Sequence, residues 1–209
     1  MTSLIVAWLV FPALLGLLSL GSGLLVERAA GTRVSGLLLI PLGLALVIVA
    51  TQIATYWDAT AELATPLVVA IALTGFATSV SRLRGSVVDL WAVAAAAGVF
   101  AVFAAPVVLA GSSTFAGYTL LGDTSIHFVL IDRVMEHGRS LAGLAPSSYE
   151  TALDVYFSSA YPLGSHTSLG AVQPLVGGDV AWVFQPFLAF IAALVCLTLY
   201  SLTAVVVRS

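Results

Sequence analysis

The sequence has no lysine and little charge of either sign. Only 8% of its 209 residues are charged, and all 7 basic side chains are arginines. A soluble domain carries about 25% charged residues, because its surface must stay hydrated. Here 60% of the residues are hydrophobic and the mean hydropathy is +1.11. The chain therefore has too little charge to cover a soluble globule, and its net charge of −3 gives no indication of a nucleic-acid partner.

Cysteine is almost absent as well. Cys196 is the only one, and it lies within an apolar run. A single cysteine excludes a disulfide framework and a cysteine-rich metal site within one chain. We interpret Cys196 as a small packing or membrane-facing residue.

What the sequence does have is a set of long apolar runs. A helix needs about 20 apolar residues to cross the hydrocarbon core of a membrane. Five runs approach or exceed this length, each with one proline, which membrane bundles tolerate. They cover residues 4–26, 34–54, 63–80, 90–111 and 181–207. The predicted fold class is all-α: a polytopic transmembrane helix bundle with one long extracytoplasmic loop that contains interfacial helices.

Arginine positions predict the orientation in the cytoplasmic membrane of the cell. Arg28 and Arg33 follow the first run, and Arg82 and Arg84 follow the third. The positive-inside rule then places the N-terminus outside. Residues 1–3 carry no basic charge and the first run is too long for the core of a signal peptide, so no cleavage is expected. The scheme puts the loops at 27–33 and 81–89 inside, and the loops at 55–62 and from 112 onward outside.

One segment, from about residue 112 to 166, is long and polar enough to carry chemistry. It contains two arginines, Arg133 and Arg139, and all 3 histidines of the chain: His127, His137 and His166. Acidic residues outnumber the arginines in it. In a chain this poor in polar side chains, such a concentration is the best indication of a site.

Residues 123–137 are predicted to form a helix along the membrane surface. Asp123 suits an N-cap and Gly138 suits a stop. Asp123 and His127 are spaced i,i+4, so they lie on one face at the helix start. The plain alternatives are a capping role for Asp123, an interfacial histidine without special function, and solvated helix charges for the arginines.

The segment at 163–176 follows a Tyr-Pro-x-Gly-x-His motif at residues 161–166. It is apolar but short for a membrane span. Two topologies stay open: a half-buried helix, with the last span ending inside, or a short crossing, with the C-terminus outside. The single charge of Arg208 favours the first.

These motifs resemble the N-terminal part of the GT-C superfamily of membrane glycosyltransferases. The resemblance covers about residues 85–207: a span preceded by arginines, Gly-Asp-x-x-x-His at 122–127 in an outer loop, and Tyr-Pro-x-Gly-x-His opening an apolar hairpin. Members move a sugar from a polyprenyl-phosphate carrier to a glycan, lipid or protein acceptor on the outer face. Residues 1–89 would then be added transmembrane helices, and residues 90–209 the start of the core of a longer enzyme.

The resemblance implies roles for particular residues. Asp123 matches the acidic catalytic residue of the first outer loop, with His127 beside it as an orienting group or metal ligand. A divalent ion, Mg or Mn, held by Asp123 and His127 is the implied cofactor. The residues implied in substrate binding are Arg133, Arg139, Tyr161 and His166.

Two other function classes are alternatives to a glycosyltransferase. A transporter or channel subunit needs ionisable groups within its spans, and none of the five runs contains one. A non-catalytic membrane scaffold would lack a cleft at Asp123 that opens to the outer leaflet.

Overall fold

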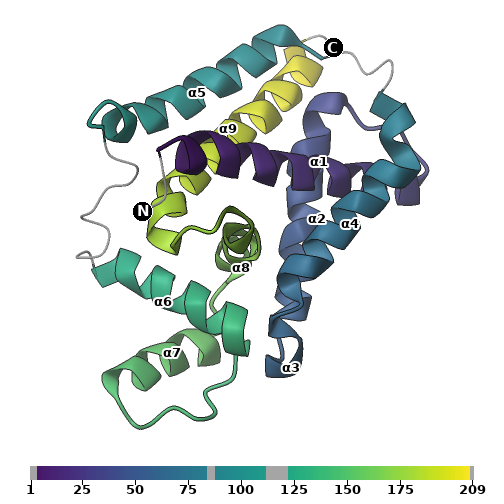
Figure 1. Ribbon diagram of the computed structural model, residues 1–209. Helices are drawn as coiled ribbons and strands as arrows, with labels where there is room; N and C mark the ends of the chain where they lie inside the picture. The colour runs from purple at the N-terminus through teal and green to yellow at the C-terminus, as the bar shows by residue number, and fades with distance from the viewer. Residues whose placement is uncertain (1–3, 84–87, 112–121, 208–209) are drawn as a thin grey trace.

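A computed structural model describes residues 4–83, 88–111 and 122–207, and every element in these ranges is helical (Figure 1). The N-terminal elements are η1 (Val6–Val10), α1 (Phe11–Ala30), η2 (Gly36–Leu38), α2 (Leu39–Ala54), α3 (Asp58–Ala61), α4 (Ala64–Ser79) and η3 (Val80–Leu83). They are followed by α5 (Leu90–Val108), α6 (Gly122–His137), α7 (Ser148–Ser158), α8 (Gly164–Val172), η5 (Gln173–Val176) and α9 (Val180–Val207).

Five helical segments are long and apolar enough to cross a membrane, which confirms the five predicted runs. They are Val6–Ala30, Gly36–Ala54, Asp58–Leu83, Leu90–Val108 and Val180–Val207. The first continues past the predicted end at residue 26, because Glu27 and Arg28 remain in the last turn of α1. The helix therefore carries ionisable residues that the apolar run did not include.

Glycines allow α1, α2 and α4 to pack backbone against backbone. Gly43 of α2 lies against the Ser19 carbonyl of α1, and Gly75 of α4 lies against the Gly21 carbonyl. A Cβ atom at either glycine would overlap those backbone atoms. Small residues bring membrane helices close enough for dense van der Waals packing, which replaces the missing hydrophobic driving force between helices in lipid.

α5 and α9 pack against each other and form a second unit of long helices (Figure 1). Asp89 caps the start of α5 and accepts a hydrogen bond of 2.8 Å from the Tyr200 hydroxyl of α9. Toward the other end of α5, Phe100 meets Trp8 edge to face, with ring centroids 6.0 Å apart. This contact joins the pair to η1, which leads into α1.

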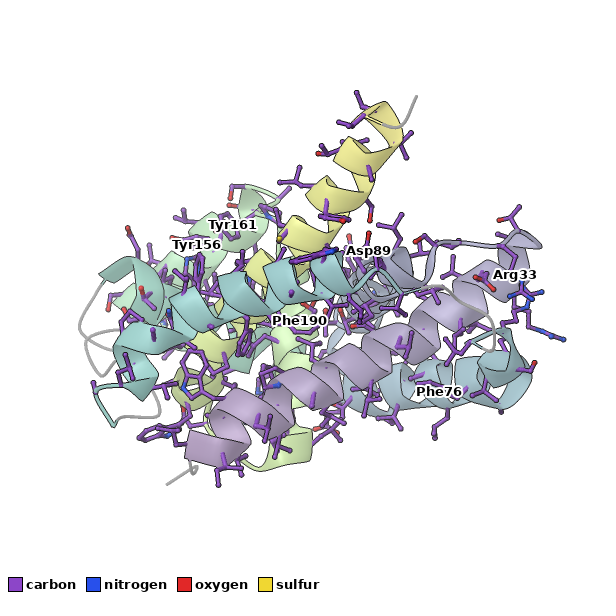
Figure 2. The ribbon with its side chains drawn as sticks, turned by 90° about the horizontal axis from the view of Figure 1, so that it is seen from above. Arg33, Phe76, Asp89, Tyr156, Tyr161 and Phe190 are labelled. Carbon is purple, nitrogen blue, oxygen red and sulfur yellow. The ribbon has the colours of Figure 1, made fainter. Side chains whose placement is uncertain are left out.

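Charged residues tie the end of α1 to the end of α4. Glu27 is buried, accepts a hydrogen bond from the Val34 amide at 3.0 Å and pairs with Arg82 at 3.1 Å. Arg33 donates to the Arg82 carbonyl. The two arginine-bearing loops therefore meet at one end of the bundle, as their predicted common side requires. Figure 2 shows Arg33 at the end opposite Tyr161. Which side of the membrane each end faces stays a prediction.

α8 is a short helix buried among the longer ones. It packs against α2 and α6 and also contacts α4, α9 and α1. Its 9 residues extend about 14 Å, against about 30 Å for the hydrocarbon core. Gly177, in a left-handed conformation, then turns the chain into α9. This geometry fits the half-buried alternative for residues 163–176.

A histidine pocket between α6, α8 and α9

The helix predicted at 123–137 is present as α6, and its stop is confirmed. Gly138 adopts φ +58°, and a Cβ there would press on the backbone of Trp57 and Asp58. The helix begins at Gly122, which puts Asp123 within its first turn. The predicted N-cap role of Asp123 is therefore wrong, and the capping position itself lies outside the described residues.

α6 is amphipathic, and its apolar side holds α7 in place. Leu130 and Val134 are fully buried in a cluster with Leu153 of α7 and with Leu163. Ser147 caps α7 by accepting a hydrogen bond from the Glu150 amide. Burial of a leucine side chain stabilises by about 1.5–3 kcal/mol, so this cluster fixes the loop segment as a packed layer.

α8 is held from two sides. On the α2 side, Thr167 Oγ1 lies 2.9 Å from Thr51 Oγ1 and 3.1 Å from Gln52 Nε2. On the α6 side, Gly170 has no side chain, which lets Met135 and Ile131 pack on its backbone. These contacts fix the rotation of α8, and with it the direction of the neighbouring His166.

His127 of α6 and His166 of α8 meet directly. Nδ1 of His127 lies 2.9 Å from Nε2 of His166, and the ring centroids are 5.0 Å apart. Tyr161 stacks on His127 and meets His166 edge to face, and its own ring rests against Tyr156. Residues 39 positions apart in sequence thus form one aromatic and polar cluster.

Burial, and then the neighbouring His127, lowers the pKa of His166 from 6.5 to about 4. His166 is therefore neutral at pH 7 and carries one ring proton. In the tautomer with that proton on Nδ1, it donates to Ser165 Oγ at 3.3 Å, and its Nε2 accepts the Nδ1 proton of His127. In a neutral His127 ring, Nε2 is then the hydrogen-bond acceptor.

These side chains form the polar side of a cavity of about 190 Å³. His127, Tyr161, Ser165 and His166 supply the polar groups. The remaining wall is apolar and comes from α6, α8 and the start of α9: Ile131, Leu169, Phe184, Phe187 and Leu188. A polar group and a hydrocarbon chain could therefore be accommodated side by side.

Of the predicted site residues, the structure brings together His127, Tyr161 and His166. Asp123 is exposed, does not line the cavity and lies one turn before His127, about 6 Å along the helix axis.

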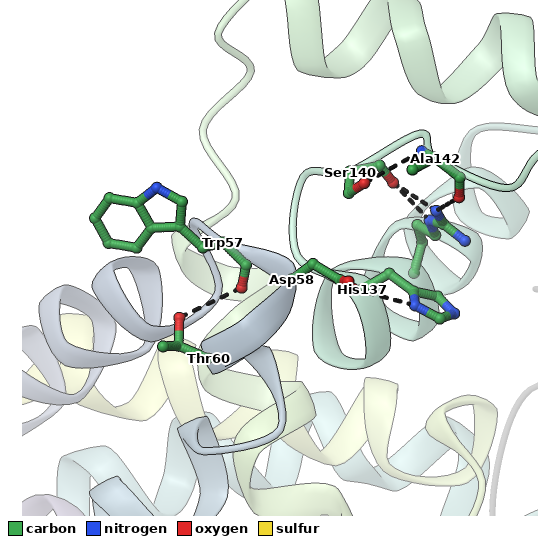
Figure 3. A network of polar contacts seen from close by, with 7 residues as sticks. Trp57, Asp58, Thr60, His137, Ser140 and Ala142 are labelled. Atoms are coloured by element: carbon green, nitrogen blue, oxygen red, sulfur yellow. Dashed lines mark hydrogen bonds and ion pairs between the residues drawn. The ribbon is translucent and has the colours of Figure 1, made fainter.

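The two arginines lie elsewhere. Arg133 is 6% exposed and donates three hydrogen bonds to the carbonyls of Ser140 and Ala142 (Figure 3). It closes the loop after α6 instead of lining the cavity. Arg139 follows α6 and donates to Gln52 Oε1 at 3.1 Å. His137, at the end of α6 nearest Arg139, already lies about 15 Å from His127 along the helix axis. One phosphate therefore cannot bind both Arg139 and His127.

A metal held by Asp123 and His127 stays a prediction. Within residues 4–83, 88–111 and 122–207, no three His, Cys, Asp or Glu side chains gather in a way that could hold an ion. The two facing nitrogens of His127 and His166 point at one another, whereas metal ligands point at a common centre. We route no chemical step through a metal.

Sequence reasoning missed the residues that position the pair. Thr167 and Gln52 hold α8, and Ser165 touches His166. The one signal was Gln52, a long polar side chain within an otherwise apolar run. A long polar side chain in a membrane span indicates a polar partner inside the bundle, and for Gln52 that partner is Thr167 of α8.

A scan against protein-family models and searches of curated proteins and solved structures find no match for this chain.

Proposed function

We propose that this chain forms part of a membrane glycosyltransferase that moves a sugar from a polyprenyl-phosphate carrier to an acceptor hydroxyl. The observation that carries the proposal is the cavity with His127 and His166 on one side and phenylalanine and leucine side chains of α9 on the other. Its two-sided lining matches a ligand that joins a polar sugar phosphate to a long hydrocarbon.

The size of the cavity supports a headgroup site. Small-molecule pockets usually measure about 300–1,000 Å³, and this one measures about 190 Å³. It accommodates a sugar or a phosphate, but not a whole lipid. The polyprenyl chain would leave along Phe184 and Leu188, at the start of a helix apolar enough to span the membrane.

The chemistry follows from the groups at the cavity. The acceptor oxygen attacks the anomeric carbon, the bond from that carbon to the phosphate oxygen breaks, and the polyprenyl phosphate leaves with the bonding electrons. The acceptor proton passes to a base. Asp123 is the base that the resemblance implies, and the lone pair on Nε2 of His127 is the group that the geometry adds. Hydrogen bonds from Tyr161 and Ser165 can stabilise charge on the departing phosphate.

The test uses the protein reconstituted in lipid nanodiscs, with radiolabelled polyprenyl-phosphate hexoses and pentoses as donors. We expect transfer to decline about 10²–10⁴-fold in the variant that lacks the base, the usual contribution of general-base catalysis. Asp123→Asn and His127→Gln distinguish the two candidates. His137→Gln, at the far end of α6, is the matched control and should retain activity.

A photoactivatable polyprenyl phosphate tests the site without depending on turnover. We expect it to label peptides of α8 and of the start of α9, and His166→Gln to reduce that labelling. Labelling confined to other helices, together with unchanged transfer by both base variants, would contradict the proposal.

A further inference from the structure

Arg139 lies beside the last turn of α2 and does not line the histidine pocket. Its guanidinium donates to Gln52, in the last turn of α2, and its Cζ lies 5.5 Å from the centre of the Tyr56 ring. Tyr56 and Trp57 are more than half exposed and follow the end of a predicted membrane span. Such aromatic residues typically mark the level of the lipid headgroups.

Two grooves meet at this arginine. One, of about 620 Å³, runs down the outer face of α2 along Ile48, Val49 and Ile53 and contains no other charged residue. The other, also about 620 Å³, extends in the polar direction toward Asp154 of α7. Tyr56, Trp57 and Arg139 line both. The grooves thus form one continuous surface, with an apolar part, a cation and then carboxylates.

The carboxylates of the polar groove differ in their partners. Asp58 lies 3.3 Å from Nδ1 of His137, as Figure 3 shows. Asp154 lines the same groove, is exposed, and has no ion pair among the described residues. Arg139 has five N–H donors, of which Gln52 accepts one. A ligand that fits this order has a hydrocarbon chain, then an anion, then a cation with hydrogen-bond donors.

We propose that this surface binds a phospholipid whose headgroup carries both a phosphate and a primary amine. The acyl chain lies along Ile48, Val49 and Ile53, the phosphate accepts hydrogen bonds from Arg139, and the ammonium group donates to Asp154. Such charge-assisted hydrogen bonds are about twice as strong as neutral ones. The site does not depend on the proposed transfer activity, because it lies at the opposite end of α6 from His127.

The order of groups also sets the selectivity. A phosphatidylcholine headgroup keeps the phosphate but has no N–H to donate to Asp154. A phosphatidylglycerol headgroup has no cation, so its net negative charge meets Asp154 and Asp58 unfavourably. Phosphatidylethanolamine satisfies both ends of the polar groove.

Lipid retention measured by native mass spectrometry tests this proposal. The protein is incubated with equimolar phosphatidylethanolamine, phosphatidylcholine and phosphatidylglycerol, and the retained lipid is counted. We expect phosphatidylethanolamine to be retained about tenfold over the other two, the effect of about 1.4 kcal/mol. Asp154→Asn should remove that preference, and Arg139→Gln should reduce retention of all three lipids. Arg28→Gln, at the other end of the bundle, is the matched control and should behave as wild type.

Graded N-methylation of the lipid amine tests the same claim in the wild-type protein, should a variant fail to fold. Retention should decline as each N–H is replaced. Equal retention of all lipids in this series, or a preference for phosphatidylglycerol, would overturn the proposal. So would displacement of the bound lipid by a polyprenyl phosphate but not by phosphatidylethanolamine.

Discussion

The two units of long helices are built differently. α1, α2 and α4 approach backbone to backbone at glycines, whereas a Cβ added at Gly98 of α5 meets no described atom within 4 Å and α9 contains no glycine. In the most apolar 18-residue window of each segment, 50%, 39% and 28% of the residues are buried in the α1, α2 and α4 segments, against 22% for the α5 segment and 17% for the α9 segment. Packing of α1, α2 and α4 against one another therefore stabilises the first unit. The second has wide apolar faces that suit lipid or further protein.

The largest expected loss of stability comes from adding one methyl group where Gly43 of α2 packs against α1. Gly43→Ala would place a Cβ against the Ser19 carbonyl, a backbone atom that cannot move aside like a side chain. Overpacking typically costs about 1–3 kcal/mol and here should reach or exceed about 3. Thermal unfolding in detergent measures it.

The same change in the second unit provides the control. A Cβ at Gly98 of α5 meets no described atom within 4 Å. Alanine is favoured over glycine in a helix by about 1 kcal/mol, so Gly98→Ala should be neutral or stabilising. Equal losses from the two changes would contradict the distinction between the units.

Acid should loosen α8, which bridges the two units. The folded protein keeps His166 neutral down to about pH 4, whereas the unfolded chain binds a proton near pH 6.5. The unfolded state therefore gains protons first, and stability falls as the pH drops from about 6.5 to about 4, by up to about 3 kcal/mol. His166→Gln should flatten this dependence in unfolding measured across that range. A wild-type profile that persists in the variant would show that other groups cause it.

A smaller effect is expected where α8 attaches to the glycine-packed unit. Thr167→Val keeps the shape of the side chain but removes the hydroxyl that meets Thr51 and Gln52. Leaving buried polar groups unpaired costs about 1–3 kcal/mol. Hydrogen exchange should increase in α8 and remain unchanged in α5. Uniform exchange in both helices would argue against this attachment.

The smallest effect is predicted within the second unit. Tyr200→Phe removes the hydrogen bond to Asp89 and should cost about 1 kcal/mol. The loss should appear as faster exchange at the start of α5, without change in α1 or α2. A larger, global loss would mean that the α5–α9 pair supports the whole fold.

Sequence alone predicted most of the helices and part of the site. Run length and hydropathy located the five long helices because lipid imposes a minimum apolar length. Gly138 located the end of α6, and Asp123 marked its start to within one or two residues although its predicted capping role was wrong. The pairing of His127 with His166 could not be predicted, because it depends on the rotation of α8, which Thr167 and Gly170 set through contacts with distant helices. The two arginines of the polar segment show the same limit. Arg133 holds the loop after α6 through hydrogen bonds to backbone carbonyls, and Arg139 lies at a separate surface beside Gln52.

The histidine pocket exists only if α8 presents His166 to His127. Cysteines at positions 127 and 166, in a Cys196→Ala background, should be joined by a short bis-methanethiosulfonate linker, detected by mass spectrometry of the linked peptides. Cysteines at 137 and 166 are the matched control, since position 137 lies about 15 Å farther along α6. We expect linkage of the first pair and not of the second. Linkage of the second pair alone, or of both equally, would contradict this expectation.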